Sequence, residues 1–170
     1  MHFSTQPWYP PLREIADQLN SHGIPYRIVG GVALVLHGVP IRTTDIDVET
    51  DQAGAYSVQE LFPDRVVLPV DWRESESYRS HFGRLDFGGV QVEIMGQIER
   101  RDGSKWVNTA VCTTATIDLD GVPVRVPWLE EEVLANIRRG RMERASQCMK
   151  YCNAEQMVQL IRGRVPTHVV

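Results

Sequence analysis

Two carboxylates separated by a single residue, Asp45 and Asp47, are the side chains in this sequence best suited to do chemistry. They lie in TDIDVETD, where acidic residues alternate with apolar or neutral ones, and this alternation predicts a strand. Because strand side chains at positions i and i+2 share a face, both carboxylates project together while Ile46 and Val48 point into the core. Two carboxylates this close repel each other, and a hard divalent cation such as Mg²⁺ offsets the repulsion. A solvent-facing acidic edge is the alternative explanation, since the acids that follow continue the same face.

A third acid, Glu93, lies within the apolar segment VQVEIM and therefore needs a partner. The Gly88–Gly89 pair between two strand-like runs predicts a hairpin with a two-residue turn. Such a turn places Arg84 opposite Glu93 and sets the Glu93 carboxylate on the face away from its apolar neighbours. Its partner is then either Arg84 across the hairpin or a metal ion shared with Asp45 and Asp47.

Gly30 and Gly31 directly follow the apolar run YRIV, where a strand is expected to turn into a helix. Glycine at this point allows two arrangements, and the sequence leaves both open. It lets the strand and the helix pack closely, or it lets backbone N–H groups at a helix N-terminus approach a phosphate. Neither the dinucleotide-binding GxGxxG pattern nor the GxxxxGK[ST] phosphate loop occurs in the sequence.

The elements that must position these residues follow from hydrophobic periodicity and turn chemistry. The polar segment 71–82 is expected to be a loop, and the run after Gly140 is expected to form one last helix. Helices are predicted at 12–19, 32–38, 53–62, 128–139 and 142–161, strands at 24–29, 44–51 and 65–70, and hairpins around 88–89 and 120–121.

This order of elements predicts an α+β (mixed α/β) fold, in which helices pack on a mixed sheet and the C-terminus is helical. A chain of 170 residues suits a single folding unit. We expect a core at 1–126, with C-terminal helices at 127–170 packed on it.

Charge, apolar runs and cysteine content limit the partners that the protein could bind and the cellular compartment in which it is expected. The formal net charge of -4 gives no general attraction for nucleic acid or anionic membranes, so a polyanion would need a local basic patch. No apolar run approaches the length of a membrane span, and the first residues lack the pattern of a secretory signal. The three cysteines, Cys112, Cys148 and Cys152, are few and odd in number, which indicates buried or idle thiols in a reducing compartment. We therefore expect a cytoplasmic protein.

The segment GGVALVLHGVPIRTTDIDVETD resembles the signature of the nucleotidyltransferase superfamily with the DNA polymerase beta-like fold. Gly30 and Gly31 match its glycine pair, Asp45 and Asp47 match its acid pair, and Glu93 matches the third acid on a later strand. The wider pattern, which adds Ala33, His37, Gly38, Arg42 and Thr44, resembles small bacterial members of abortive-infection toxin type and of the aminoglycoside and lincosamide antibiotic kind.

The resemblance implies a nucleotidyltransferase mechanism. Asp45 and Asp47 would coordinate Mg²⁺ (or Mn²⁺), and Glu93 would either complete the metal site or take the proton from the acceptor hydroxyl. Gly30 and Gly31 would hold the phosphates of a nucleoside triphosphate, with ATP as the expected donor. Arg42 and Thr44 belong to the same candidate binding set, although a salt bridge from Arg42 to Glu49 or Asp51 and a structural role for Thr44 are alternatives.

The expected reaction moves a nucleoside monophosphate onto a hydroxyl of a small molecule and releases pyrophosphate. One alternative is a toxin-like enzyme acting on tRNA or a protein partner, although the modest basic content does not favour nucleic acid. A non-catalytic nucleotide-binding module is another. Few residues remain to form an acceptor pocket, so a shallow pocket, or one completed by a homodimer or partner protein, is expected. Trp72, Tyr78 and Trp106 are its candidate lining residues, although they could equally cover the sheet edge. Arg141, Arg144 and Lys150 are candidates for a phosphate-binding or base role, with a solvated basic helix face as the alternative.

Overall fold

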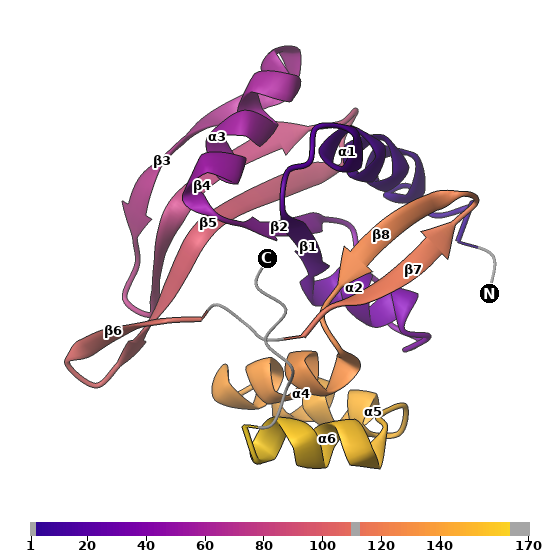
Figure 1. Cartoon of the computed structure of the whole chain (residues 1–170), viewed down its shortest axis with the longest axis vertical. Helices are drawn as coiled ribbons and strands as arrows, with labels where there is room; N and C mark the ends of the chain where they lie inside the picture. Colours follow the sequence, from indigo (N-terminus) through magenta and orange to yellow (C-terminus); the bar gives the residue numbers. More distant parts are fainter. Residues whose placement is uncertain (1–2, 110–112, 164–170) are drawn as a thin grey trace.

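The computed structural model describes residues 3–109 and 113–163 and has the predicted mixed α+β architecture (Figure 1). A twisted sheet carries helices on its faces, and three short helices gather below it at the C-terminal end of the chain. The helices are α1 (Tyr9–Ser21), α2 (Gly30–Leu36), α3 (Gln52–Leu61), α4 (Leu129–Arg138), α5 (Met142–Met149) and α6 (Ala154–Ile161). The strands are β1 (Tyr26–Val29), β2 (Ile46–Thr50), β3 (Val66–Glu74), β4 (Tyr78–Asp86), β5 (Gln91–Asp102), β6 (Lys105–Asn108), β7 (Ala115–Leu119) and β8 (Val122–Val126).

The main sheet has the order β1-β2-β5-β4-β3, with β6 paired to the far end of β5. All of its neighbouring pairs are antiparallel except β2 and β5, which are parallel. Strands β7 and β8 form a separate two-stranded sheet that packs on α1 and β1. The parallel pair brings together two segments that lie far apart in the sequence, and it holds the acids discussed below.

The hairpin around Gly88 and Gly89 has the predicted register. The Phe87 N–H donates to the Val90 carbonyl (2.9 Å), and Arg84 lies opposite Glu93. Both glycines have positive φ (68° and 94°), which the tight turn requires and which other residues adopt only with strain.

Two predictions about secondary structure were wrong. The polar segment 71–82 is not a loop, because it forms the end of β3, a short turn and the start of β4. The end of β3 is exposed, whereas the start of β4 is half-buried and includes the buried Ser80. No clear apolar alternation therefore marked the segment, and backbone pairing between the two strands forms it instead. The last helix is broken into α5 and α6, because Asn153 caps α6 by accepting bonds from the N–H groups of Glu155 and Gln156.

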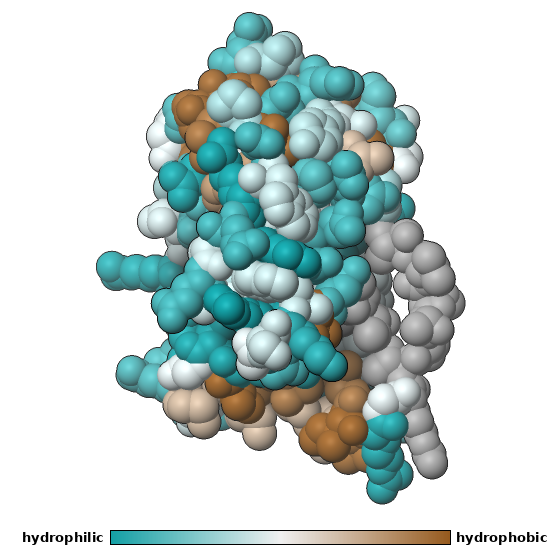
Figure 2. Space-filling view, turned by 90° about the vertical axis from the view of Figure 1, so that its left-hand side faces the viewer, coloured by the Kyte–Doolittle hydropathy of each residue, from teal (hydrophilic) through white to brown (hydrophobic). Residues whose placement is uncertain are grey.

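The C-terminal helices are fixed to the rest of the chain by apolar packing. Leu34 and Val39 from the α2 region cluster with Leu129, Val133 and Ala145 of α4 and α5. On the side of the molecule shown in Figure 2, the surface at mid-height is mostly hydrophilic, whereas apolar side chains gather at the level of these helices. No helix in the described ranges combines the length and apolar character needed to cross a membrane.

Candidate active site

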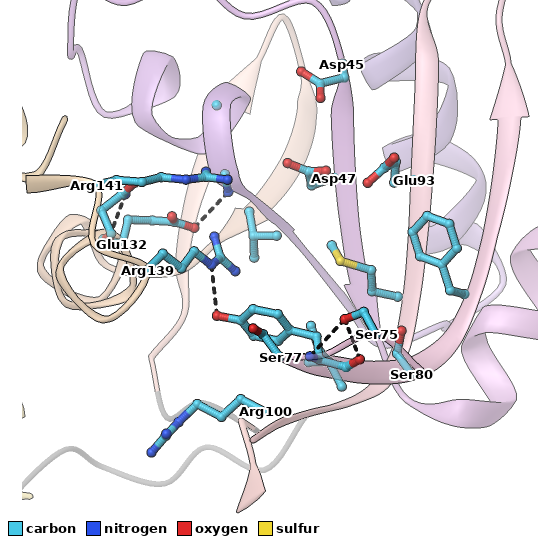
Figure 3. Close-up of a pocket in the computed structure, with 18 of the residues that line it drawn as sticks. Asp45, Asp47, Ser75, Ser77, Ser80, Glu93, Arg100, Glu132, Arg139 and Arg141 are labelled. Atoms are coloured by element: carbon cyan, nitrogen blue, oxygen red, sulfur yellow. Dashed lines mark hydrogen bonds between the residues drawn. The ribbon is translucent and has the colours of Figure 1, made fainter. Parts of the chain in front are cut away.

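The acid pair and Glu93 lie together because β2 and β5 are parallel neighbours. In this register Asp47 is paired directly with Glu93. The alternating residues Ile46 and Val48 are fully buried, so the carboxylates face the other side of the sheet. Asp45, Asp47 and Glu93 line one cavity of about 1070 Å³. Figure 3 shows the three carboxylates grouped on one wall of this cavity, which we call the acid wall.

The acid wall is electrostatically costly in the absence of a cation. Burial, and then the charges of Asp45 and Glu93, raise the pKa of Asp47 from 3.8 to about 7. Arg139 and Arg141 oppose this shift, which places both guanidinium groups within electrostatic reach of Asp47. A divalent cation bound among these carboxylates would favour their ionised forms and so relieve the repulsion.

Glu93 already has partners within its own hairpin. Its Oε1 accepts hydrogen bonds from Arg84 Nε (3.1 Å) and Gln91 Nε2 (2.9 Å), which confirms the predicted cross-strand pair. In the described part of the chain, no three His, Cys, Asp or Glu side chains are arranged to hold a metal ion. The carboxylate oxygens of the acid wall are nevertheless the ligand type that Mg²⁺ and Mn²⁺ prefer, so the chemistry fits a divalent cation.

Gly30 and Gly31 are required by close packing against the strand that carries the acids. Gly30 has φ +68°, and a Cβ atom on it would overlap Oδ2 of Asp47. A Cβ on Gly31 would overlap Oγ1 of Thr43 and lie 2.8 Å from the Thr43 Cβ. Thr43 in turn donates a hydrogen bond to Asp45 Oδ1 (3.3 Å). The glycine pair therefore lets the start of α2 lie directly against the acid pair.

Glu132 of α4 is a site residue that sequence reasoning missed. It is buried (4% exposed) and accepts a hydrogen bond from the Gly30 N–H (2.8 Å), drawn as a dashed line in Figure 3. Burial raises the pKa of Glu132 from 4.5 to about 7, although the bond from Gly30 and the charge of Arg139 oppose the shift. The sequence did contain a sign of this. Glu130, Glu131 and Glu132 are consecutive and spread over more than half of the helix circumference, so at least one of them had to face the protein interior.

Glu131, beside it, forms part of a buried charge network. Arg27 is 3% exposed and donates to Glu49 (2.9 Å) and to Glu131 (3.2 Å). Glu131 also accepts a hydrogen bond from Thr113. The network ties β1, β2 and α4 together directly behind the cavity.

Arg42 and Thr44 both line the cavity, as do Arg141 and Arg144. The expected salt bridge from Arg42 to Glu49 or Asp51 is not formed among the described residues. Glu49 pairs with Arg27, and Asp51 instead caps α3 by accepting a bond from the Gly54 N–H (2.6 Å).

The three aromatic residues expected near the acceptor have different positions. Tyr78 lines the cavity, and its hydroxyl accepts a hydrogen bond from Arg139 Nε (3.2 Å). Trp72 and Trp106 do not line it but pack against the guanidinium of Arg79, with ring centres at 5.4 and 4.7 Å. The described residues of a single chain form a cavity of about 1070 Å³, which Tyr78 and the acid wall both line.

The remaining candidates lie away from the cavity. Lys150 is exposed and does not line it. Cys148 is buried and Cys152 is half-buried, and burial raises the pKa of each thiol, which suits inert packing residues. Cys112 lies outside the described residues.

Comparison of the chain with known proteins identifies one matching family and several similar structures. The profile of the aminoglycoside-2''-adenylyltransferase family matches residues 11–149. The structure of TM1012 from Thermotoga maritima, a protein assigned as a nucleotidyltransferase, has 30% sequence identity and a TM-score of 0.76, covering 88% of this chain and 98% of that one. No curated protein matches the chain.

Two antibiotic-modifying enzymes share the fold at low sequence identity. ANT(2'')-Ia in complex with adenylyl-2''-tobramycin has 12% identity and a TM-score of 0.54, covering 92% of this chain and 95% of that one. The lincosamide antibiotic adenylyltransferase LnuA, with lincomycin bound, has 16% identity and a TM-score of 0.52, covering 74% and 83%.

Proposed function

This chain belongs to the aminoglycoside-2''-adenylyltransferase family and is a nucleotidyltransferase, and from this premise we propose that it moves a nucleoside monophosphate onto a hydroxyl of a small molecule. The donor is a nucleoside triphosphate, with ATP expected, and pyrophosphate is the second product. The observation that carries the proposal is the parallel register of β2 and β5. It sets Glu93 beside Asp47 in the cavity that Gly30 and Gly31 also line.

In this proposal Asp45, Asp47 and Glu93 hold Mg²⁺ or Mn²⁺. Held by these carboxylates, the cation would supply positive charge to offset the charge that develops on the phosphates and on the departing pyrophosphate. The pKa of Asp47, raised first by burial and then by the charges of Asp45 and Glu93, supports this role, because a bound cation would favour the ionised carboxylate. Glu93 lies at the edge of the group and is also our candidate for accepting a proton.

The phosphates of the donor are assigned to the glycine side of the cavity. Gly30 contributes by leaving room beside Asp47, since its own N–H is already bonded to Glu132. Arg42 and Thr44, together with the N–H of Gly31, are the proposed contacts on this side. Arg139 and Arg141 face Asp47 from the C-terminal helices and would add positive charge next to the triphosphate.

The transfer is an in-line displacement at the α-phosphorus. The acceptor oxygen bonds to this phosphorus while the bond from the phosphorus to the bridging oxygen breaks, and pyrophosphate leaves with that oxygen. The hydroxyl proton passes to Glu93 and then to solvent. The chain's own residues thus orient the two reactants and receive the proton.

A catalytic role is favoured over a non-catalytic nucleotide-binding module. Three carboxylates that repel one another in a partly buried cavity destabilise the folded chain unless a cation offsets them. A module that only bound nucleotide would have no use for this arrangement.

Thermal unfolding with and without MgATP or MgGTP tests the proposal without knowledge of the acceptor. A nucleotide at about 100 times its Kd should add roughly 2.7 kcal/mol, which is about 5–10 °C for a chain of this size. The shift should require Mg²⁺ and should be absent in Asp47→Asn, which should also lack transfer activity. Asp64→Asn, an exposed acid outside the cavity, is the matched control and should keep the shift. A shift that persists unchanged in Asp47→Asn would contradict the assignment of the acid wall.

A further inference from the structure

The cavity is unusually rich in arginine. Nine of its lining residues are arginines and five are acids, and no lysine or histidine lines it within the described ranges. The planar guanidinium group forms paired hydrogen bonds with phosphate and carboxylate groups, which a lysine ammonium group cannot do. The choice of arginine therefore points to ligands with planar or tetrahedral oxyanions.

None of the five acids is available to bind a positively charged acceptor. Asp45, Asp47 and Glu93 form the acid wall, which the proposed function assigns to the cation. Glu132 is buried and bonded to the Gly30 N–H. Glu74 lies 3.9 Å from Arg79 in an exposed ion pair. An amino sugar with several ammonium groups would consequently meet arginines and, among the described residues that line the cavity, no free carboxylate to receive it.

Most of the arginines lack an acidic partner. Only Arg79 and Arg100 form ion pairs within the part of the chain that the structure describes. Arg139 and Arg141 lie near Asp47, and with Arg42 they are the arginines that the proposed function assigns to the triphosphate. The other arginines exceed what the donor nucleotide requires.

Two of the cavity's arginines, Arg100 and Arg138, lie away from the acid wall, and we call them the distal arginines. Arg100 also pairs with the exposed Asp102 (3.3 Å). Both line the main cavity and a smaller recess that adjoins it. In Figure 3, Arg100 lies far from Asp45 and Asp47, with Arg139 between them. The distal arginines thus face the space that is left for an acceptor once the triphosphate lies beside the acid wall.

We propose that the acceptor is a small anion, a molecule that carries a phosphate or carboxylate group in addition to the hydroxyl that is modified. The inference rests on the proposed function and specifies its substrate class. The distal arginines bind the anionic group, and the hydroxyl reaches the α-phosphorus at the acid wall. The bonds made and broken are those of the displacement given above. The charge of this acceptor is opposite to that of tobramycin, the amino sugar bound in its adenylylated form by the relative ANT(2'')-Ia.

The test identifies the charge of the acceptor before its structure is known. A small-molecule extract of cells is separated by anion and cation exchange, and each fraction is incubated with the protein, Mg²⁺ and ATP labelled at the α-phosphate. Tobramycin and the extract's RNA are assayed in parallel. We expect label to be transferred only with fractions retained by the anion exchanger.

The distal arginines are then tested by substitution. The double variant Arg100→Gln/Arg138→Gln should raise the KM for the active fraction at least about tenfold, because charge-assisted hydrogen bonds are lost. Its thermal shift with MgATP should be retained. Arg162→Gln, an exposed arginine outside the cavity, is the matched control and should leave both values unchanged.

Each other outcome overturns the inference. Transfer to tobramycin, to unretained or cation-exchange fractions, or to RNA alone would show that the acceptor is not a small anion. Transfer to no fraction with the MgATP shift retained would favour the non-catalytic nucleotide-binding module, and it would overturn the proposed transfer together with the inference that rests on it. Loss of the MgATP shift in the wild-type protein would instead refute the proposed function, so the two failures are distinguishable.

Discussion

Glu132→Gln tests whether the Glu132 carboxyl group, which accepts a bond from the Gly30 N–H, is largely protonated near neutral pH. Burial raises the pKa of Glu132 from 4.5 to about 7 in the folded chain. The folded state therefore holds this proton more tightly than the unfolded state. The contribution of protonated Glu132 to the stability of the fold is therefore complete below pH 4.5 and is lost as the pH rises through about 7. A shift of this size corresponds to about 3 kcal/mol of unfolding free energy.

The glutamine variant removes the titration but keeps an oxygen to accept the bond from the Gly30 N–H. At pH 8 it should be more stable than wild type by about 3 kcal/mol, because the pKa shift already includes the bond from the Gly30 N–H to the ionised carboxylate. At pH 4.5 the variant should be equal to wild type or slightly less stable.

Urea denaturation of the metal-free protein at several pH values between 4.5 and 8 measures both curves. Asp47 and Glu131 also have a pKa raised to about 7, so the wild-type curve alone is composite, and the difference between the two curves isolates Glu132. Glu143→Gln, an exposed glutamate in the first turn of α5, is the control. Parallel curves for wild type and Glu132→Gln would refute the reasoning, because they would mean that folding does not change the affinity of Glu132 for its proton.

Two further substitutions test how the site is supported. Arg27→Met should cost about 3–5 kcal/mol at pH 8, because it leaves the half-buried Glu49 and Glu131 without their cation. The cost should shrink below pH 6 as Glu131 takes up a proton, and an equal cost at both pH values would contradict this account. Alanine normally stabilises a helix relative to glycine, yet Gly31→Ala should destabilise the protein by roughly 1–3 kcal/mol because the new Cβ meets Thr43. Adding Thr43→Gly should recover part of that loss in the same denaturation assay, and an additive effect would exclude the clash as its cause.

Much of the fold was determined locally and could be predicted. The alternation in TDIDVETD, the two glycine turns and the helix-boundary residues depend on neighbours in the sequence, and the corresponding elements formed where they were expected. The prediction of a loop at 71–82 failed because the segment is polar and shows no clear apolar alternation, so pairing between β3 and β4 decides its conformation. The break before α6 depends partly on Glu130, which accepts a bond from the Asn153 N–H (2.5 Å) across the C-terminal helices.

The sequence by itself determined that Asp45 and Asp47 share one face of a strand, because a strand repeats every two residues whatever surrounds it. It also provided Glu93 and its hairpin partner, because a two-residue turn fixes the register. Only the tertiary structure decided that Glu93 lies beside Asp47, since parallel pairing joins strands that are distant in the sequence. The contacts of Glu132 and Arg139 with the site likewise depend on tertiary structure, because α4 lies far from the acids in the sequence and reaches them only by packing. The charge of the cavity, and with it the class of acceptor, arises from that long-range packing.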